Sequence, residues 1–187
     1  ATSVRALYYN KDLFEQAGLE PPKDWKELKA AAEKLTKRPR VYGFAMPIHS
    51  ADQGDMFNYF LWSAGGNWFD DQGNVILNSP EAVEALQFMV DLYQARVTNP
   101  QPWANTRDET QKIFSGGRAA MIPTGNFFVP SLEKNNPDLR YGITAIPANK
   151  APGTMAVTDT LAFFNREGQD KEAVWKFVEF IYERKWR

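Results

Sequence analysis

The sequence VRALYYNKDLFEQAGLEPPKDWKELKAAAEKL, residues 4–35, contains the clearest structural signals in the chain. An apolar run with strand character at 4–9 leads directly into a short helix, which Gly18 ends as a C-cap. After two prolines, an Asp-x-x-Glu capping-box pattern starts a second helix. We therefore predict a strand followed by helices at 11–17 and 24–36. The apolar positions of the second helix recur at helical spacing: Trp25, Leu28, Ala32 and Leu35.

Beyond this stretch, apolar runs with strand character alternate with helical patterns. Further strands are predicted at 41–46, 119–123, 141–146 and 160–164. Further helices are predicted at 53–64, 80–95, 107–114, 126–134 and 170–184. Strands separated by helices favour an α/β domain, a layered sheet with flanking helices.

The helix at 80–95 has the strongest start signal, with Ser79 as N-cap and Pro80 at the first helical position. Its apolar residues include Val83, Leu86, Val90 and Tyr93 down one face. Aromatic residues make up 14% of the chain, and helical spacing assigns several of them to the core. These are Phe88, Tyr93, Trp175, Phe177 and Phe180.

Composition excludes several classes of function. The 187 residues are 43% hydrophobic, carry a net charge of -1 and show no basic stripe, so nucleic acid is not an expected partner. No apolar run approaches the roughly 20 residues that span a bilayer. The chain has no cysteine, which excludes disulfides, thiolate metal sites and a cysteine nucleophile.

Nothing in the sequence indicates catalysis. His49 is the only histidine, and no HExxH, GxSxG or phosphate-loop spacing is present. Gly116-Gly117-Arg118 ends a helix, whereas a phosphate loop begins one. We expect a protein that is not an enzyme, with no catalytic residue, metal or cofactor.

Four ordered blocks resemble one family, the extracellular solute-binding proteins of ABC sugar importers, of the maltose-binding-protein type. The first is YYNKDLF followed by AGL, a proline pair and a Trp-led helix. The second is the segment at 57–93, with its Gly-Gly turn, small hairpin and long helix. IFSGGRAAMIPTGNF at 113–127 and YGITAIP at 141–147 complete the series.

The resemblance implies one lobe of a type II periplasmic-binding-protein fold. It implies that residues 1–150 are the second, C-terminal lobe, including the first hinge strand. Residues 151–187 would then carry the chain back across the hinge, the return crossing, and end in a helix that packs on a missing first lobe. The chain is thus expected to be a truncated fragment that exposes apolar surface at 4–9 and on the helix at 170–184, which could favour self-association. Its parent is expected to be periplasmic or extracellular, anchored at the cell surface, with a signal peptide absent from this chain. A sugar and the ABC permease subunits are the implied partners.

Ligand contacts are expected from two segments. In the resembled family, a strand with an Ala-Met pair is followed by a turn that presents an aromatic residue to the sugar. Here the pair is at 120–121, and the turn contains Thr124, Asn126 and Phe127. A loop and helix start present further contacts, here Gln53, Asp55, Met56 and Asn58. The competing interpretation of the second segment is a helix N-cap at Asp55 or Asp52, and that of Phe127 is core packing. We predict that both segments line one open concave face.

Arg5 lies between apolar residues of the first strand, and a buried arginine needs an acidic partner or a ligand. Asp159, where the chain returns to the first lobe, is one candidate partner, and both Arg5 and Asp159 are predicted ligand contacts, although the family has glycines near 157–159. The function that these residues favour is binding of a sugar or oligosaccharide for an ABC importer. The alternatives are the same fold binding glycerol phosphate esters or another polar metabolite, and an accessory carbohydrate-binding domain of a secreted enzyme.

Overall fold

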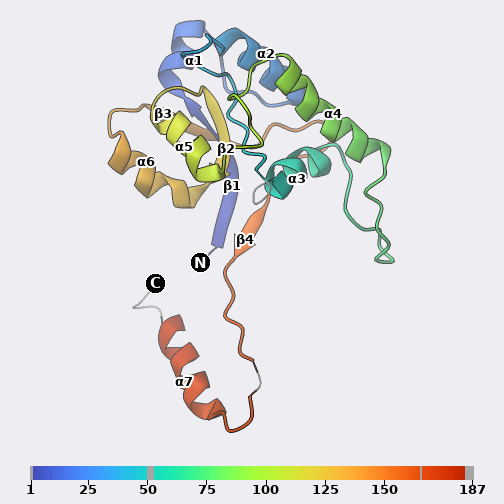
Figure 1. Cartoon of the computed structure of the whole chain (residues 1–187), viewed down its shortest axis with the longest axis vertical. Helices are drawn as coiled ribbons and strands as arrows, with labels where there is room; N and C mark the ends of the chain where they lie inside the picture. The colour runs from blue at the N-terminus through green and yellow to red at the C-terminus, as the bar shows by residue number, and fades with distance from the viewer. Residues whose placement is uncertain (1, 50–52, 165, 184–187) are drawn as a thin grey trace.

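Strand β1 (Thr2–Asn10) is the centre of the sheet in this computed structural model, which describes residues 2–49, 53–164 and 166–183, without the side chains of 2 and 53. The upper part of β1 lies between β2 (Met121–Gly125) and β3 (Tyr141–Thr144), and its first residues pair with β4 (Ala156–Thr158) (Figure 1). All three pairings are antiparallel, with Tyr8 opposite both Ile122 and Ile143.

Alternation along β1 creates a core on each face of the sheet. Leu7 points to a core that includes residues of α2 (Trp25–Leu35), α3 (Gln53–Ser63) and α4 (Pro80–Gln94), and Phe14 of α1 (Lys11–Ala17). Tyr8 points to a second core with residues of α5 (Arg107–Ser115), the 3₁₀ turn η1 (Asn126–Phe128) and α6 (Val129–Asn135). Helices on both faces of one sheet confirm the layered α/β prediction.

The helix boundaries follow the capping signals of the sequence. The Asn10 side chain accepts a hydrogen bond from the Leu13 amide, and Gly18 ends α1 in the left-handed conformation at φ 62°. Asp24 accepts from the Glu27 amide at 2.7 Å, and Glu27 accepts from the Lys23 amide at 2.8 Å. Such caps satisfy amide groups that the first helical turn leaves without a partner.

The apolar face that the sequence assigned to α4 is not the face that packs. Val83, Leu86 and Tyr93 are exposed, by 59%, 55% and 42%, so the core assignment of Tyr93 was wrong. The buried positions are Ala82, Ala85, Met89 and Leu92, while Phe88 is part-buried and stacks on Trp25. Small alanine side chains let α4 lie close to α3, and two adjacent apolar stripes cannot be ranked by periodicity alone.

Two predicted strands do not form. The segment 41–46 makes only single bridges, at Val41 with Lys37, at Tyr42 with Ala119 and at Phe44 with Thr98. Between the last two, Gly43 passes so close to the α2 backbone at Ala32 that no side chain would fit, and this contact interrupts any ladder. Residues 160–164 have no regular structure, and the strand of this region is β4 instead.

Helix α7 (Lys171–Tyr182) stands apart from the other elements at the end of an extended segment (Figure 1). None of its residues is buried, and Trp175, Phe177 and Phe180 are at least half exposed. Their assignment to the core of this chain was therefore wrong, whereas the expected exposure of this helix is confirmed. On β1, Val4 is exposed, but Leu7 and Tyr8 are buried on opposite faces of the sheet. The expectation that the whole run at 4–9 is exposed was therefore wrong as well.

Candidate functional site

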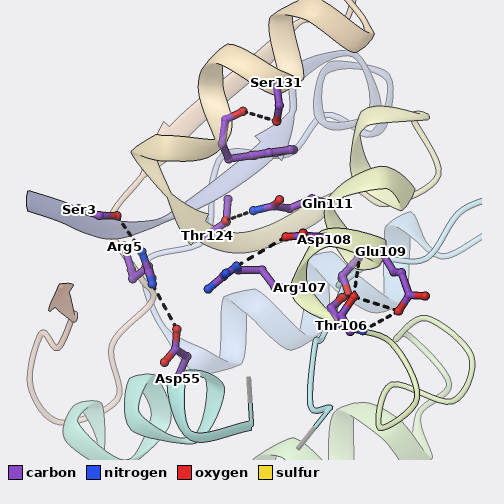
Figure 2. A network of polar contacts seen from close by, with 12 residues as sticks. Ser3, Arg5, Asp55, Thr106, Arg107, Asp108, Glu109, Gln111, Thr124 and Ser131 are labelled. Atoms are coloured by element: carbon purple, nitrogen blue, oxygen red, sulfur yellow. Dashed lines mark hydrogen bonds and ion pairs between the residues drawn. The ribbon is translucent and has the colours of Figure 1, made fainter. Parts of the chain in front are cut away.

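A buried arginine lies at the end of the sheet where β1 leaves its neighbour β2. Arg5 has the same parity along β1 as Leu7, so its side chain lies on the α3 face, and only 6% of the residue is exposed. Its guanidinium donates to Asp55 Oδ2 at 3.3 Å and to Ser3 Oγ at 2.7 Å (Figure 2). Arg5 thus connects β1 with the first turn of α3.

A second arginine approaches from the opposite side. Arg107 is the first residue of α5, and its guanidinium extends toward that of Arg5 (Figure 2). The Arg5 and Arg107 guanidinium carbons lie 4.9 Å and 5.1 Å from the centroid of the Phe127 ring. Both distances are within the range of a cation–π interaction. Phe127 itself remains 42% exposed.

Tyr59, one turn further along α3, completes what we call the arginine cluster: Arg5, Asp55, Tyr59, Arg107 and Phe127. Burial raises the pKa of the Tyr59 phenol to about 12, the negative charge of Asp55 contributes in the same direction, and the two arginines oppose it. Tyr59 therefore stays protonated at neutral pH and keeps its capacity to donate a hydrogen bond.

The cluster borders a small pocket that strand β2 closes on one side. Thr124 contributes to its wall, and the Thr124 hydroxyl accepts a hydrogen bond from Gln111 Nε2 of α5 at 2.8 Å. Pro47, Met56 and Pro123 supply the apolar part of the lining. The pocket thus combines charged, hydroxyl and apolar groups from β1, α3, α5 and β2.

Gly125 makes room for this arrangement. A Cβ atom at this position would lie 2.5 Å from an Arg5 guanidinium nitrogen and 2.6 Å from Ser3 Oγ, and it would also overlap the Phe127 ring. The backbone of Gly125 is extended, at φ -101°, so glycine is favoured here by the space that these side chains occupy and not by conformation.

The structure brings together several of the predicted ligand contacts from segments far apart in sequence. Arg5, Asp55, Met56 and Thr124 all line the pocket, and Phe127 adjoins it through both arginines. Arg5 pairs with Asp55, a residue for which the sequence left a ligand contact and a helix cap as equal alternatives. Asp55 lies in the first turn of α3, within the helix, and Asp52 is outside the described residues.

The other predicted ligand contacts are not among the described residues that line the pocket. The Asn58 side-chain oxygen Oδ1 accepts a hydrogen bond from Trp68 Nε1, which connects α3 with the hairpin before α4. Asn126 is exposed beside Phe127, and Asp159 is exposed just after β4. The side chain of Gln53 is outside the described part of the chain. The pairing of Asp159 with Arg5 stays a prediction.

Sequence reasoning missed Arg107 and Tyr59. One signal could have identified Arg107: it follows the N-cap Thr106, where the positive end of the helix dipole disfavours a cation. An arginine in that place suggests another reason for its presence. Tyr59 carries no such signal, because an apolar position on a helix next to Phe60 is expected to be core.

The described residues contain neither a metal-binding cluster nor a membrane-spanning helix. No group of three or more histidine, aspartate or glutamate side chains there is arranged to hold a metal ion. Within the same ranges, every helix falls short of the length and hydropathy needed to cross a bilayer.

Comparison with known proteins places the chain among binding proteins. Residues 1–187 match the family described as bacterial extracellular solute-binding protein. A putative binding protein of Brucella abortus (strain 2308) is 35% identical over 191 residues, which cover 100% of this chain and 46% of the relative. The sn-glycerol-3-phosphate-binding periplasmic protein of Escherichia coli (strain K12) is 28% identical, covering 96% of this chain and 43% of its own length.

Solved structures agree in fold. A solute-binding protein of an ABC transporter from Thermotoga lettingae, bound with α-D-tagatose, superimposes with a TM-score of 0.84 at 30% identity, covering 99% of this chain and 49% of the other. Maltose-bound MalE3 of T. maritima gives 0.83 at 26% identity, with the same two shares. The chain spans about half the length of the relatives and structures it matches.

Proposed function

This chain belongs to the bacterial extracellular solute-binding protein family, and from that premise we propose that it forms one wall of the ligand site in the substrate-binding component of an ABC importer. The protein binds its ligand and releases it unchanged to membrane permease subunits. The ligand class is carbohydrate, meaning a sugar, an oligosaccharide or a polyol.

The arginine cluster and the half-exposed ring of Phe127 support this proposal above all. A carbohydrate presents hydroxyl groups to planar hydrogen-bonding side chains and C–H faces to aromatic rings. Arg5, Arg107 and Phe127 offer both kinds of surface next to one pocket. The tagatose-bound and maltose-bound neighbours share the fold with this chain and are consistent with that ligand class.

The second part of the proposal is a two-lobed mechanism. Residues 1–150 form the lobe that carries the cluster, and 151–187 cross back toward a first lobe. In support, the crossing is hydrogen-bonded to β1, from the Arg5 amide to the Met155 carbonyl at 3.0 Å, whereas α7 buries nothing against this lobe. Closure of two lobes on a hinge traps the ligand between them, outside the cytoplasmic membrane.

Two alternatives from the sequence remain for comparison. A glycerol phosphate ester or another polar metabolite keeps the fold and changes the ligand, and the Escherichia coli relative that binds sn-glycerol 3-phosphate favours it. An accessory domain of a secreted enzyme finds no support in the family match, which covers the whole chain.

A ligand screen on the protein expressed at the full length of its gene tests the proposal. We expect one or a few compounds from a panel of sugars, polyols and phosphate esters to raise the melting temperature, and calorimetry to confirm stoichiometric binding. No shift with any carbohydrate or polyol, or release of reducing sugar that a single carboxylate substitution abolishes, would contradict it.

The Phe127→Ala variant tests the role of the aromatic face. Loss of this contact area, and of the ring that supports both arginines, should weaken ligand binding by about 1–3 kcal/mol. The matched control is Phe69→Ala, because Phe69 is 54% exposed in the hairpin before α4 and should leave affinity unchanged. Equal losses in both variants would remove Phe127 from the site.

A further inference from the structure

The charge of the arginine cluster carries information about the ligand. Arg5 and Arg107 lie over one ring, so their positive charges are within about one Debye length, roughly 10 Å at 0.1 M salt. Repulsion between them is therefore only partly screened. Such a pair is stable where negative charge lies near both cations.

Among the described residues, the pocket lining carries less negative than positive charge. Of the described lining residues, Asp55 is the one carboxylate beside the two arginines, and its oxygen is 3.3 Å from Arg5. Asp108 lies 4.0 Å from Arg107 Nε, but its side chain is 77% exposed and contributes little in water. The described lining thus has two guanidinium groups and a single carboxylate.

Arg5 also has an unused hydrogen-bond donor. Its Nε atom is buried and has no hydrogen-bond partner among the described residues. Because the Arg5 side chain is only 5% exposed, water has little access to this donor. A buried donor of a charged group without an acceptor costs free energy, and such exceptions are rare in folded proteins. This donor therefore indicates an acceptor that the described residues do not provide.

The position of Arg107 points the same way. A cation at the first residue of α5 is opposed by the helix dipole, and the capping box at Thr106 needs no arginine beside it. If the cluster served only to hold α3 against β1, the Arg5–Asp55 pair would suffice. Arg107 adds a second positive charge to the pocket, from the first residue of α5.

We infer that Arg5 and Arg107 together bind an anionic group of the ligand, a carboxylate or a phosphate ester, so that the transported compound is an acidic carbohydrate derivative and not a neutral sugar. The inference rests on the proposed function of this site. One negative charge between two guanidinium groups gains charge-assisted hydrogen bonds from both and relieves their mutual repulsion. Phe127 then supports the arginines as well as the ligand.

The test compares matched acidic and neutral compounds by calorimetry on the protein expressed at full gene length. The probes are glucose, glucuronate and glucose 6-phosphate, with glycerol and sn-glycerol 3-phosphate as a second set. We expect an acidic member to bind at least about tenfold more tightly than its neutral counterpart, and its affinity to fall as salt is raised. The comparison of carboxylate with phosphate identifies the anionic group.

Arg107→Gln is the decisive variant, because the residue is at the surface end of the cluster and its loss leaves the Arg5–Asp55 pair in place. Affinity for the acidic ligand should fall about tenfold to hundredfold, whereas that for the neutral counterpart, which loses no charge–charge attraction, should fall by a much smaller factor. The control is Arg118→Gln, an exposed arginine just beyond the other end of α5.

The possible outcomes distinguish the inference of an anionic ligand from the proposed binding function. Tighter binding of neutral compounds, or an equal loss for both classes in Arg107→Gln, overturns the anionic ligand and leaves carbohydrate binding intact. Failure of every compound in both sets and in the wider panel overturns the proposed function and the inference with it.

Discussion

At the scale of single residues, the site depends on a glycine and on a tyrosine that contact charged neighbours. Gly125 leaves space for the Arg5 guanidinium, and the Tyr59 phenol lies buried beside Asp55 and both arginines. Neither residue would attract attention in the sequence, since each is ordinary for its element. Their importance follows from what the fold places against them.

Gly125→Ala should abolish measurable ligand binding while the protein stays folded. The new methyl group would overlap Arg5 and Phe127, and these side chains would have to leave their positions. Gly54→Ala is the matched control, because a Cβ there meets nothing within 4 Å and alanine is the better helix former in α3. Calorimetry and circular dichroism on both variants check this, and unchanged affinity in Gly125→Ala would contradict it.

The raised pKa of Tyr59 predicts that the free energy of unfolding depends on pH in the alkaline range. The tyrosine pKa is near 10 when unfolded and about 12 in the folded protein, so the folded state holds the proton more tightly. Its contribution is complete below pH 10 and is lost as pH rises toward 12, to a total of about 3 kcal/mol at most. Urea unfolding of the wild type and Tyr59→Phe across this range should show the steeper decline in the wild type, and parallel curves would refute it.

At the scale of elements, helix α5 positions two of the polar side chains at the site. Its first residue is Arg107, its Gln111 donates to Thr124 on β2, and its start is set by a reciprocal capping box. The Thr106 hydroxyl accepts from the Glu109 amide, and the Glu109 carboxylate accepts from the Thr106 amide at 2.8 Å. That hydrogen bond and the Thr106 hydroxyl lower the pKa of Glu109. The local start of α5 therefore controls where Arg107 points.

Thr106→Ala should cost about 0.5–2 kcal/mol of stability and also weaken ligand binding, because the first turn of α5 loses its cap and Arg107 its fixed direction. Thr106→Ser keeps the hydroxyl oxygen and should restore both properties. Chemical denaturation and calorimetry on the two variants measure this, and an alanine variant with full affinity would show that Arg107 does not depend on the cap.

At the scale of the whole molecule, the cluster is one wall of the proposed site. The chain spans about half the length of the proteins it matches, and it presents Arg5, Asp55 and Phe127 at one end of the sheet. A ligand held from both sides gains contacts from each lobe and is shielded from water on closure. The affinity of this half alone should therefore be much lower.

The 187-residue chain expressed by itself should bind the same ligand at millimolar affinity or weaker, if the full-length protein binds near 1 μM, or about -8 kcal/mol. Losing roughly half of the favourable contacts accounts for the difference. Parallel calorimetry on both forms decides this. Comparable affinities would mean that the two-lobed mechanism is wrong for this protein.

The local sequence was sufficient for most helix boundaries and for β1. Asn10, Gly18, Asp24 and Ser79 act through hydrogen bonds within a few residues, so their effect can be read without knowing the fold. The four ordered blocks led to the family, and Phe127, Asp55 and Arg5 were recognised as candidates by residue type and position.

Tertiary structure alone decided which partners these residues have. Asp55 meets Arg5 across 50 positions of sequence, and Arg107 reaches the same ring from a third element. It also buried the face of α4 that carries Ala82 and Ala85 and left the stripe with Val83 exposed. Such choices depend on contacts between distant segments, and a local pattern contains no information about what will lie opposite.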